Sequence, residues 1–227
     1  MKRILLGLTL ALLLLGTPVV GAAYIDLQFQ GQTGSVSVQR SLDYGANYST
    51  ALAGQFLFTN EGTTYTNLTD IYTFCVEPLE YTQSGIVRYD VAPLENAPTN
   101  YGPMGVTKAN LLRELYGTYY TVNTPVATNI GAALQIATWE IVREESGVLG
   151  VTTGSTRFTG DVTVLNLAES YLQGITNNVG PMRYDIAAAI NVGAQDPWIP
   201  NVPIPGAVWL LGSGLLGLVA IRRRFQK

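Results

Sequence analysis

The sequence contains no histidine and only one cysteine, Cys75, in 227 residues. Without histidine, the Ser-His-Asp and Cys-His arrangements of nucleophilic catalysis are excluded, and the commonest zinc ligand is missing. A lone cysteine cannot form a disulfide within the chain. We also find no phosphate-binding loop, no cluster of metal ligands and no tandem repeat. We therefore expect no metal and no cofactor.

Basic residues are scarce between the two ends of the chain. Six of the 13 Lys and Arg residues lie within 1–23 and 201–227, whereas all 16 Asp and Glu residues lie between them. The segment 24–200 therefore has a net charge near −9. Nucleic-acid binding needs a basic face, so we expect no nucleic-acid partner. The acidic composition suits an extracellular module.

The N-terminus has the three parts of a secretory signal peptide. Met1–Arg3 is basic, Ile4–Leu15 is leucine-rich, and Gly21–Ala23 supplies the small residues that signal peptidase requires. We predict a signal peptide over 1–23, cleaved after Ala23. The alternative is an uncleaved N-terminal anchor.

The C-terminal segment 201–227 joins a proline box, an apolar run and a basic end. The two prolines of Val202–Pro205 cannot join a helix interior. The uncharged run 206–221 predicts a transmembrane helix, because a helix satisfies its own backbone in lipid, and the arginines behind it favour the cytoplasmic side. The run is slightly shorter than the roughly 20 residues that a bilayer core needs. An ordinary single-span anchor and a buried core helix are the alternatives.

This order of features resembles the PEP-CTERM sorting tail of Gram-negative bacteria, which a membrane exosortase recognises. Val-Pro-Ile-Pro stands here where the family often has Pro-Glu-Pro. The resemblance implies export across the inner membrane, transient anchoring by the C-terminal helix, and arrival at the cell surface or in a biofilm or exopolysaccharide matrix. The sorting residues are Val202, Pro203, Pro205, Arg222, Arg223 and Arg224.

Residues 24–200 have the length of one domain, and their first half has the apolar–polar alternation of strands. Tyr24–Gln30 and Ser35–Arg40 predict a hairpin around Gly31–Gly34. Further strands are predicted over Ala53–Thr59, Asp70–Val76 and Ile86–Val91.

The spacing of apolar residues becomes helical in the second half. We predict a helix over Lys108–Tyr116 with Thr107 as N-cap, a longer helix to about Glu144 with Thr128 or Asn129 as N-cap, and a helix over Val164–Leu172. Ser146–Gly160 is predicted as a loop, and Tyr184–Val192 as a late strand, with a helix as the alternative. The predicted fold class is α+β, an N-terminal antiparallel sheet or small barrel with helices packed on it. The expected core residues on these helices are Leu111, Leu115, Leu134, Trp139 and Ile141.

Two fragments of this domain carry residues suited to chemistry. Cys75 lies in the aromatic strand end Tyr72–Pro78, and Gln135 and Trp139 lie four residues apart on a predicted helix, so on one face of it. With Ala137 they resemble the internal-thioester domains of Gram-positive surface adhesins, which join a strand-end cysteine to a helical glutamine. Thr138 departs from that pattern, where an apolar residue is usual.

The resemblance implies a Cys75–Gln135 thioester, with Phe74, Ala137 and Trp139 around it. A thiolate is intrinsically nucleophilic, and packing that holds sulfur and carboxamide together replaces an external catalyst. An outside amine could open the product. The alternative is a small buried cysteine beside an ordinary core glutamine and tryptophan.

Two functional classes follow from these patterns. The first is a non-enzymatic surface or matrix protein, such as an adhesin, with an extracellular protein or polysaccharide as ligand. The second is a secreted glycan hydrolase that uses carboxylates, with Glu77, Glu80 and Glu140 as candidates. Glu140, Glu144 and Glu145 are predicted to form a solvated helix end, in preference to a metal site or an acid/base pair.

Overall fold

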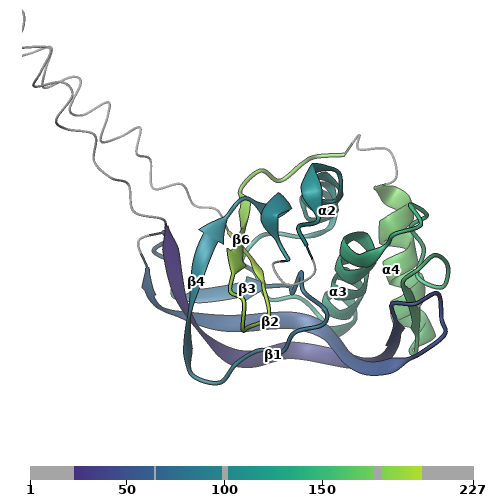
Figure 1. Cartoon of the computed structure of the whole chain (residues 1–227), viewed down its shortest axis with the longest axis horizontal. Coiled ribbons are helices and arrows are strands. Elements are labelled where there is room, and N and C mark those ends of the chain that lie inside the picture. The colour runs from purple at the N-terminus through teal and green to yellow at the C-terminus, as the bar shows by residue number, and fades with distance from the viewer. Residues whose placement is uncertain (1–22, 64, 99–101, 176–179, 201–227) are drawn as a thin grey trace, which may run out of the picture.

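The computed structural model describes residues 23–63, 65–98, 102–175 and 180–200. In these ranges the chain has an α+β fold, in which an antiparallel sheet curves toward a barrel and three α-helices gather at one side of it (Figure 1). The predicted fold class is confirmed at this level. The signal peptide and the sorting tail fall almost wholly outside the described residues. Among the helices that are described, none combines the length and the apolar character needed to cross a membrane.

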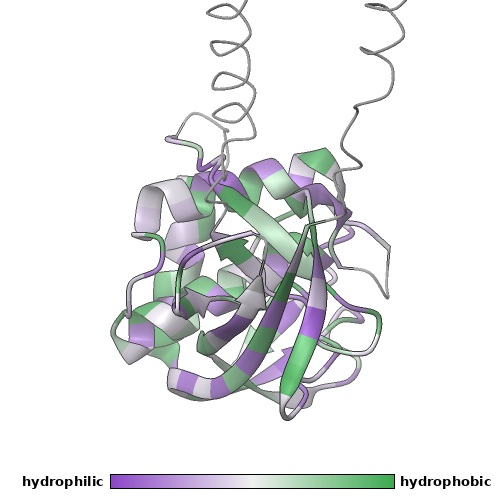
Figure 2. Cartoon of the chain, turned by 90° about the vertical axis from the view of Figure 1, so that its left-hand side faces the viewer, coloured by the Kyte–Doolittle hydropathy of each residue, from purple (hydrophilic) through white to green (hydrophobic). Residues whose placement is uncertain are grey.

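Two long antiparallel strands form the middle of the sheet. β1 and β2 pair from Ile25 opposite Thr63 to Arg40 opposite Ser49. Hydrophobic and hydrophilic residues alternate along the strands (Figure 2), as expected for a sheet with one buried face. The strand order is β3-β2-β1-β4-β6-β7, and β5 pairs with the end of β1. The strands are β1 (Tyr24–Ser41), β2 (Ser49–Thr63), β3 (Asp70–Thr73), β4 (Ile86–Ala92), β5 (Arg157–Thr159), β6 (Ile186–Ile190) and β7 (Trp198–Pro200).

The two edge strands of the sheet, β3 and β7, meet and nearly close it. Cys75, just beyond β3, forms a β-bridge with Pro197. The Trp198 N–H donates to the Phe74 carbonyl at 3.2 Å, and the Thr73 hydroxyl donates to the Trp198 carbonyl. Residues 125 positions apart in sequence are thereby joined. This closure encloses Cys75 inside the barrel.

The helices are α2 (Gly105–Tyr119), α3 (Thr128–Arg143) and α4 (Val162–Gly174), and η1 (Leu94–Asn96) is a short 3-10 turn. The central helix, α3, is buried from Gly131 to Val142 because it packs against β1, β2 and α4. One core cluster lies between helices and sheet, and a second fills the barrel with side chains such as Phe58, Ile71 and Cys75. Of the predicted core residues, Leu115, Leu134, Trp139 and Ile141 are buried and Leu111 is partly buried.

The predicted hairpin around Gly31–Gly34 is wrong. Residues 24–41 form one strand, and both glycines lie at register shifts opposite β2. Gly31 has a φ of 129°, and a Cβ on Gly34 would lie 2.4 Å from Thr128 Oγ1 at the start of α3. The glycines therefore mark β-bulges and a close helix contact, since β2 is long enough to pair across them.

Most other predicted elements are present, with shifted boundaries. Strands β3 and β4 and the late strand β6 are confirmed, whereas β5 lies in the predicted loop Ser146–Gly160 and β7 was not predicted. Thr107 is not an N-cap, because α2 begins earlier, at Gly105. The predicted N-cap of α3, Thr128 or Asn129, is also wrong, because Ala127 is the N-cap and Thr128 is the first residue of the helix. The described helix with a side-chain cap is α4, where the Asp161 carboxylate accepts from the Thr163 and Val164 N–H groups.

Candidate functional site

Cys75 and Gln135, 60 residues apart in sequence, lie in direct contact, and both are fully buried. The Cys75 N–H donates to Gln135 Oε1 at 3.0 Å, and Gln135 Nε2 donates to the Cys75 carbonyl at 2.8 Å. The side-chain amide thus pairs with the backbone N–H and C=O of a single residue, as a neighbouring strand would. The Cys75 backbone has room for this partner because Cys75 lies just beyond β3. The sheet continues there through the bridge between Cys75 and Pro197.

The sulfur of Cys75 is held in a tight turn formed by its own chain. Sγ donates to the Glu77 carbonyl at 3.0 Å and accepts from the Glu77 N–H at 3.2 Å. Burial raises the pKa of the Cys75 thiol strongly, while the Trp139 side chain and the Glu77 backbone act in the opposite direction. Trp139 is therefore close to the sulfur, although its Nε1 makes no hydrogen bond of normal geometry among the described residues. Burial thus favours the protonated thiol and shields it from water.

The predicted surroundings of Cys75 divide between the two sides of the strand end. Phe74 and Ala137 are buried in the cluster between helices and sheet, and Phe74 stacks on Tyr116 with ring centroids 5.5 Å apart. Cys75 points the other way, into the barrel. Gln135 and Trp139, one helical turn apart, both reach Cys75. The structure thus brings the cysteine, the glutamine and the tryptophan together, and Phe74 and Ala137 support the elements that carry them.

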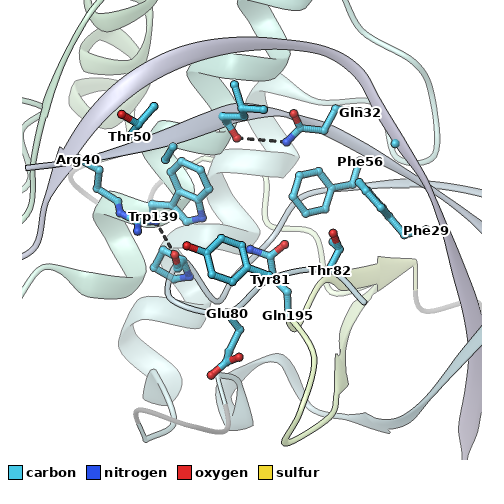
Figure 3. A pocket seen from close by; sticks show the side chains of 14 residues that line it. Phe29, Gln32, Arg40, Thr50, Phe56, Glu80, Tyr81, Thr82, Trp139 and Gln195 are labelled. Atoms are coloured by element: carbon cyan, nitrogen blue, oxygen red, sulfur yellow. Dashed lines mark hydrogen bonds between the residues drawn. The ribbon is translucent and has the colours of Figure 1, made fainter. Parts of the chain in front are cut away.

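A cavity of about 440 Å³ opens beside this pair, between β1, β2 and the segment after Glu77 (Figure 3). Trp139 lies on the side of the cavity that faces Cys75. Gln195, also on the cavity wall, donates a hydrogen bond to the Glu77 carbonyl, which accepts from the Cys75 thiol as well. Two residues of the cavity wall, Trp139 and Gln195, therefore also contact the surroundings of the sulfur. The lining residues used below are Arg40, Leu52, Phe56, Tyr81, Trp139 and Gln195.

Sequence reasoning missed Arg40 and Gln195 as lining residues of this cavity. Arg40 lies near the end of β1, with its guanidinium 5.5 Å from the ring centroid of Trp139 and its Nη1 donating to the Pro78 carbonyl. Gln195 precedes β7. Neither residue belongs to a local motif, because distant strands meet α3 to form the cavity.

The carboxylates proposed for a hydrolase do not gather at this cavity. Among the described acidic residues, Glu80 alone lines it, whereas Glu77 and Glu140 are fully buried outside its lining. The Gly150 N–H donates to Glu140 Oε1 at 3.0 Å, and burial raises the pKa of Glu140 to about 8. Among the described residues, the cavity lining therefore holds no pair of carboxylates.

The predicted solvated helix end is wrong for two of its three glutamates. Glu140 and Glu144 are buried, and Glu145 is exposed. Glu144 accepts hydrogen bonds from the backbone N–H groups of Ser146, Ser155 and Thr156. Burial works to raise the pKa of Glu144, but these hydrogen bonds outweigh it and leave the pKa lowered. The two glutamates thus hold the 144–156 segment against α3. The composition of that segment is typical of a surface loop, so the sequence did not indicate this contact.

Comparison with known proteins gives no identification. No model of a protein family, no curated protein and no solved structure matches this chain. The functional argument accordingly rests on the residues and contacts described above.

Proposed function

We propose that residues 24–200 form an exported, non-enzymatic surface or matrix module, an adhesin in type, whose Cys75 and Gln135 join in an internal thioester. The observation that carries the proposal is the double hydrogen bond that holds the Gln135 carboxamide against the Cys75 backbone in a buried site. Cys75 carries the only thiol in the sequence, so its sulfur is the nucleophile that the proposal assigns to this carboxamide. Orientation of this kind supplies several kcal/mol toward a reaction between neighbouring groups.

Thioester formation requires that sulfur attack the side-chain carbonyl carbon of Gln135. The C–N bond breaks, the nitrogen leaves with the thiol proton as ammonia, and no external reactant is consumed. Negative charge develops on Oε1 during the attack, where the Cys75 N–H already donates at 3.0 Å. A backbone donor aimed at a developing oxyanion is among the most effective stabilising groups in acyl chemistry. Burial favours the protonated form of the thiol, so its proton is available to the leaving nitrogen.

Opening of the thioester by an amine would return the sulfur to a thiol. A primary amine attacks the acyl carbon, the C–S bond breaks, and one amine proton ends on Cys75, leaving an amide at Gln135. Trp139 and the closed strand edge exclude water, which protects the thioester until an amine arrives. The domain would thereby attach covalently to an amine on an extracellular partner.

The export half of the proposal rests on the two ends of the chain. Signal peptidase would remove 1–23, and an exosortase would act on the tail that begins at Asn201. The intervening protein would pass from a transient membrane anchor to the cell surface or the extracellular matrix of a Gram-negative bacterium.

Peptide mapping by mass spectrometry of the purified full-length chain tests the thioester. We expect the Cys75 and Gln135 peptides to be linked with the loss of one ammonia, and methylamine to be incorporated at Gln135. Cys75→Ala should abolish both effects. Gln55, also buried but bonded to Tyr120 and the Thr124 carbonyl, is the internal control and should stay unmodified. A chain of full sequence mass with a Cys75 thiol that titrates after unfolding would exclude the thioester and leave a structural cysteine.

A further inference from the structure

Arg40 is a partly buried cation with no acidic partner in the part of the chain that the structure describes. None of the ion pairs formed by the described residues involves it, and its Nε has no hydrogen-bond acceptor there. Its contacts are the Pro78 carbonyl and the face of Trp139. Burial is the main cause that lowers the pKa of Arg40, and the groups that oppose this, Cys75 and Tyr81, are not carboxylates. A buried guanidinium without a counter-ion is costly, so an anion from outside would relieve that cost.

The other residues that line the cavity indicate which further groups a ligand of Arg40 would carry. Figure 3 shows Arg40 and Trp139 at one end of the cavity, Phe56 and Phe29 at the other, and Tyr81 and Gln195 between them. The Glu80 carboxylate points away from the other labelled side chains (Figure 3). Amide and hydroxyl groups on the wall suit a ligand rich in hydroxyls, and aromatic rings suit the apolar face of a sugar ring. The volume of about 440 Å³ lies in the usual range for small-ligand sites.

We propose that this cavity binds an acidic sugar unit, a uronate, with Arg40 pairing the carboxylate and the amide and hydroxyl side chains contacting the ring hydroxyls. An acidic peptide side chain would need only a fraction of the space. The proposal does not depend on the thioester. The net charge of the domain, near −9, repels polyanions at long range, so the affinity comes from contacts inside the cavity.

Isothermal titration of the full-length chain with digalacturonate, at physiological ionic strength, tests the proposal. The matched probe is the dimethyl ester of the same disaccharide, which keeps every ring hydroxyl and loses both charges. We expect the ester to bind roughly tenfold or more weakly, as is usual when a charged hydrogen bond is lost. Arg40→Met should abolish binding. Arg40→Lys should retain part of it, since lysine keeps the positive charge but lacks the planar guanidinium that can bond both carboxylate oxygens.

Arg157→Met is the control variant, because Arg157 also donates to one backbone carbonyl, that of Gly154, but does not line the cavity. It should bind as wild type does. Leu52→Trp covers the case in which Arg40→Met fails to fold. Leu52 is 56% exposed at the cavity rim, so a larger side chain there should block binding without touching the core.

Equal binding of acid and ester, wild-type affinity in Arg40→Met, or no binding of digalacturonate would each overturn the proposal. Binding of N-acetylglutamate amide without binding of digalacturonate would replace the sugar with an acidic peptide. The mass measurement on Cys75 and Gln135 is unaffected by any of these outcomes, so the two proposals fail separately.

Discussion

At the scale of single residues, Glu140 makes the stability of the domain depend on pH. One of its oxygens accepts from the Gly150 N–H, and the other has no partner among the described residues. Burial is the main cause of its raised pKa, and Glu144 and Glu169 add repulsion. The folded state therefore holds the Glu140 proton more tightly than the unfolded state does.

We predict that Glu140 destabilises the folded protein progressively between about pH 4.5 and pH 8. The folded-state pKa is about 8 against an ordinary value of 4.5, so stability is fully present below the lower value and is lost as pH rises through the higher one. Glu140→Gln should remove this slope and be more stable than wild type above pH 8, by on the order of a few kcal/mol. The urea concentration at the midpoint of unfolding, measured across this pH range, tests the prediction. Glu145→Gln, an exposed neighbour, should leave the slope unchanged.

Gln135 should matter to the fold whether or not it reacts. Gln135→Ala would leave the buried N–H and carbonyl of Cys75 without their side-chain partners, at about 1–3 kcal/mol each. We expect a total loss of about 2–5 kcal/mol in urea unfolding, with cavity formation contributing. Cys75→Ala keeps the backbone groups paired and should cost less, about 1–2 kcal/mol. Equal losses in the two variants would show that the amide pairing contributes little.

At the scale of elements, the core between helices and sheet depends on apolar residues of α2 that the helical spacing correctly singled out. Leu115 is fully buried, so Leu115→Ala should reduce the free energy of unfolding by about 2–5 kcal/mol. Leu111→Ala, at a partly buried position on the same helix, is the matched control. It should reduce the free energy of unfolding clearly less than Leu115→Ala does. Chemical denaturation of both variants tests this, and a loss below about 0.5 kcal/mol for Leu115→Ala would place that side chain at the surface.

The strand register was the least predictable feature at this scale. Local alternation located the segments of β1 but divided the strand at Gly31–Gly34, because glycine signals both turns and bulges. The choice between them depends on whether the partner strand continues, and β2 does continue, from Ser49 to Thr63. The short strand β5 likewise depends on pairing with β1, and β7 on pairing with β6 and on its hydrogen bonds to the end of β3.

At the scale of the whole molecule, we predict a mature protein that starts near Tyr24 and is processed close to Val202–Pro205. The reason is the combination of a basic–apolar–small N-terminus with a proline–apolar–arginine C-terminus. Terminal peptide mapping of protein from the native host measures both ends. Recovery of the intact Arg222–Lys227 peptide from surface-exposed protein would contradict processing and leave a simple membrane anchor.

The sequence by itself determined the fold class, most of the elements, the buried leucines and the pairing of Cys75 with Gln135 as a hypothesis. These features depend on local periodicity and on rare residue types, which short segments carry. Only the tertiary structure decided that the sheet closes through Phe74 and Trp198, that Glu140 and Glu144 are buried, and that Arg40 faces a cavity beside Trp139. Each of these depends on contacts between segments distant in sequence, where burial and charge pairing arise only after the chain has folded.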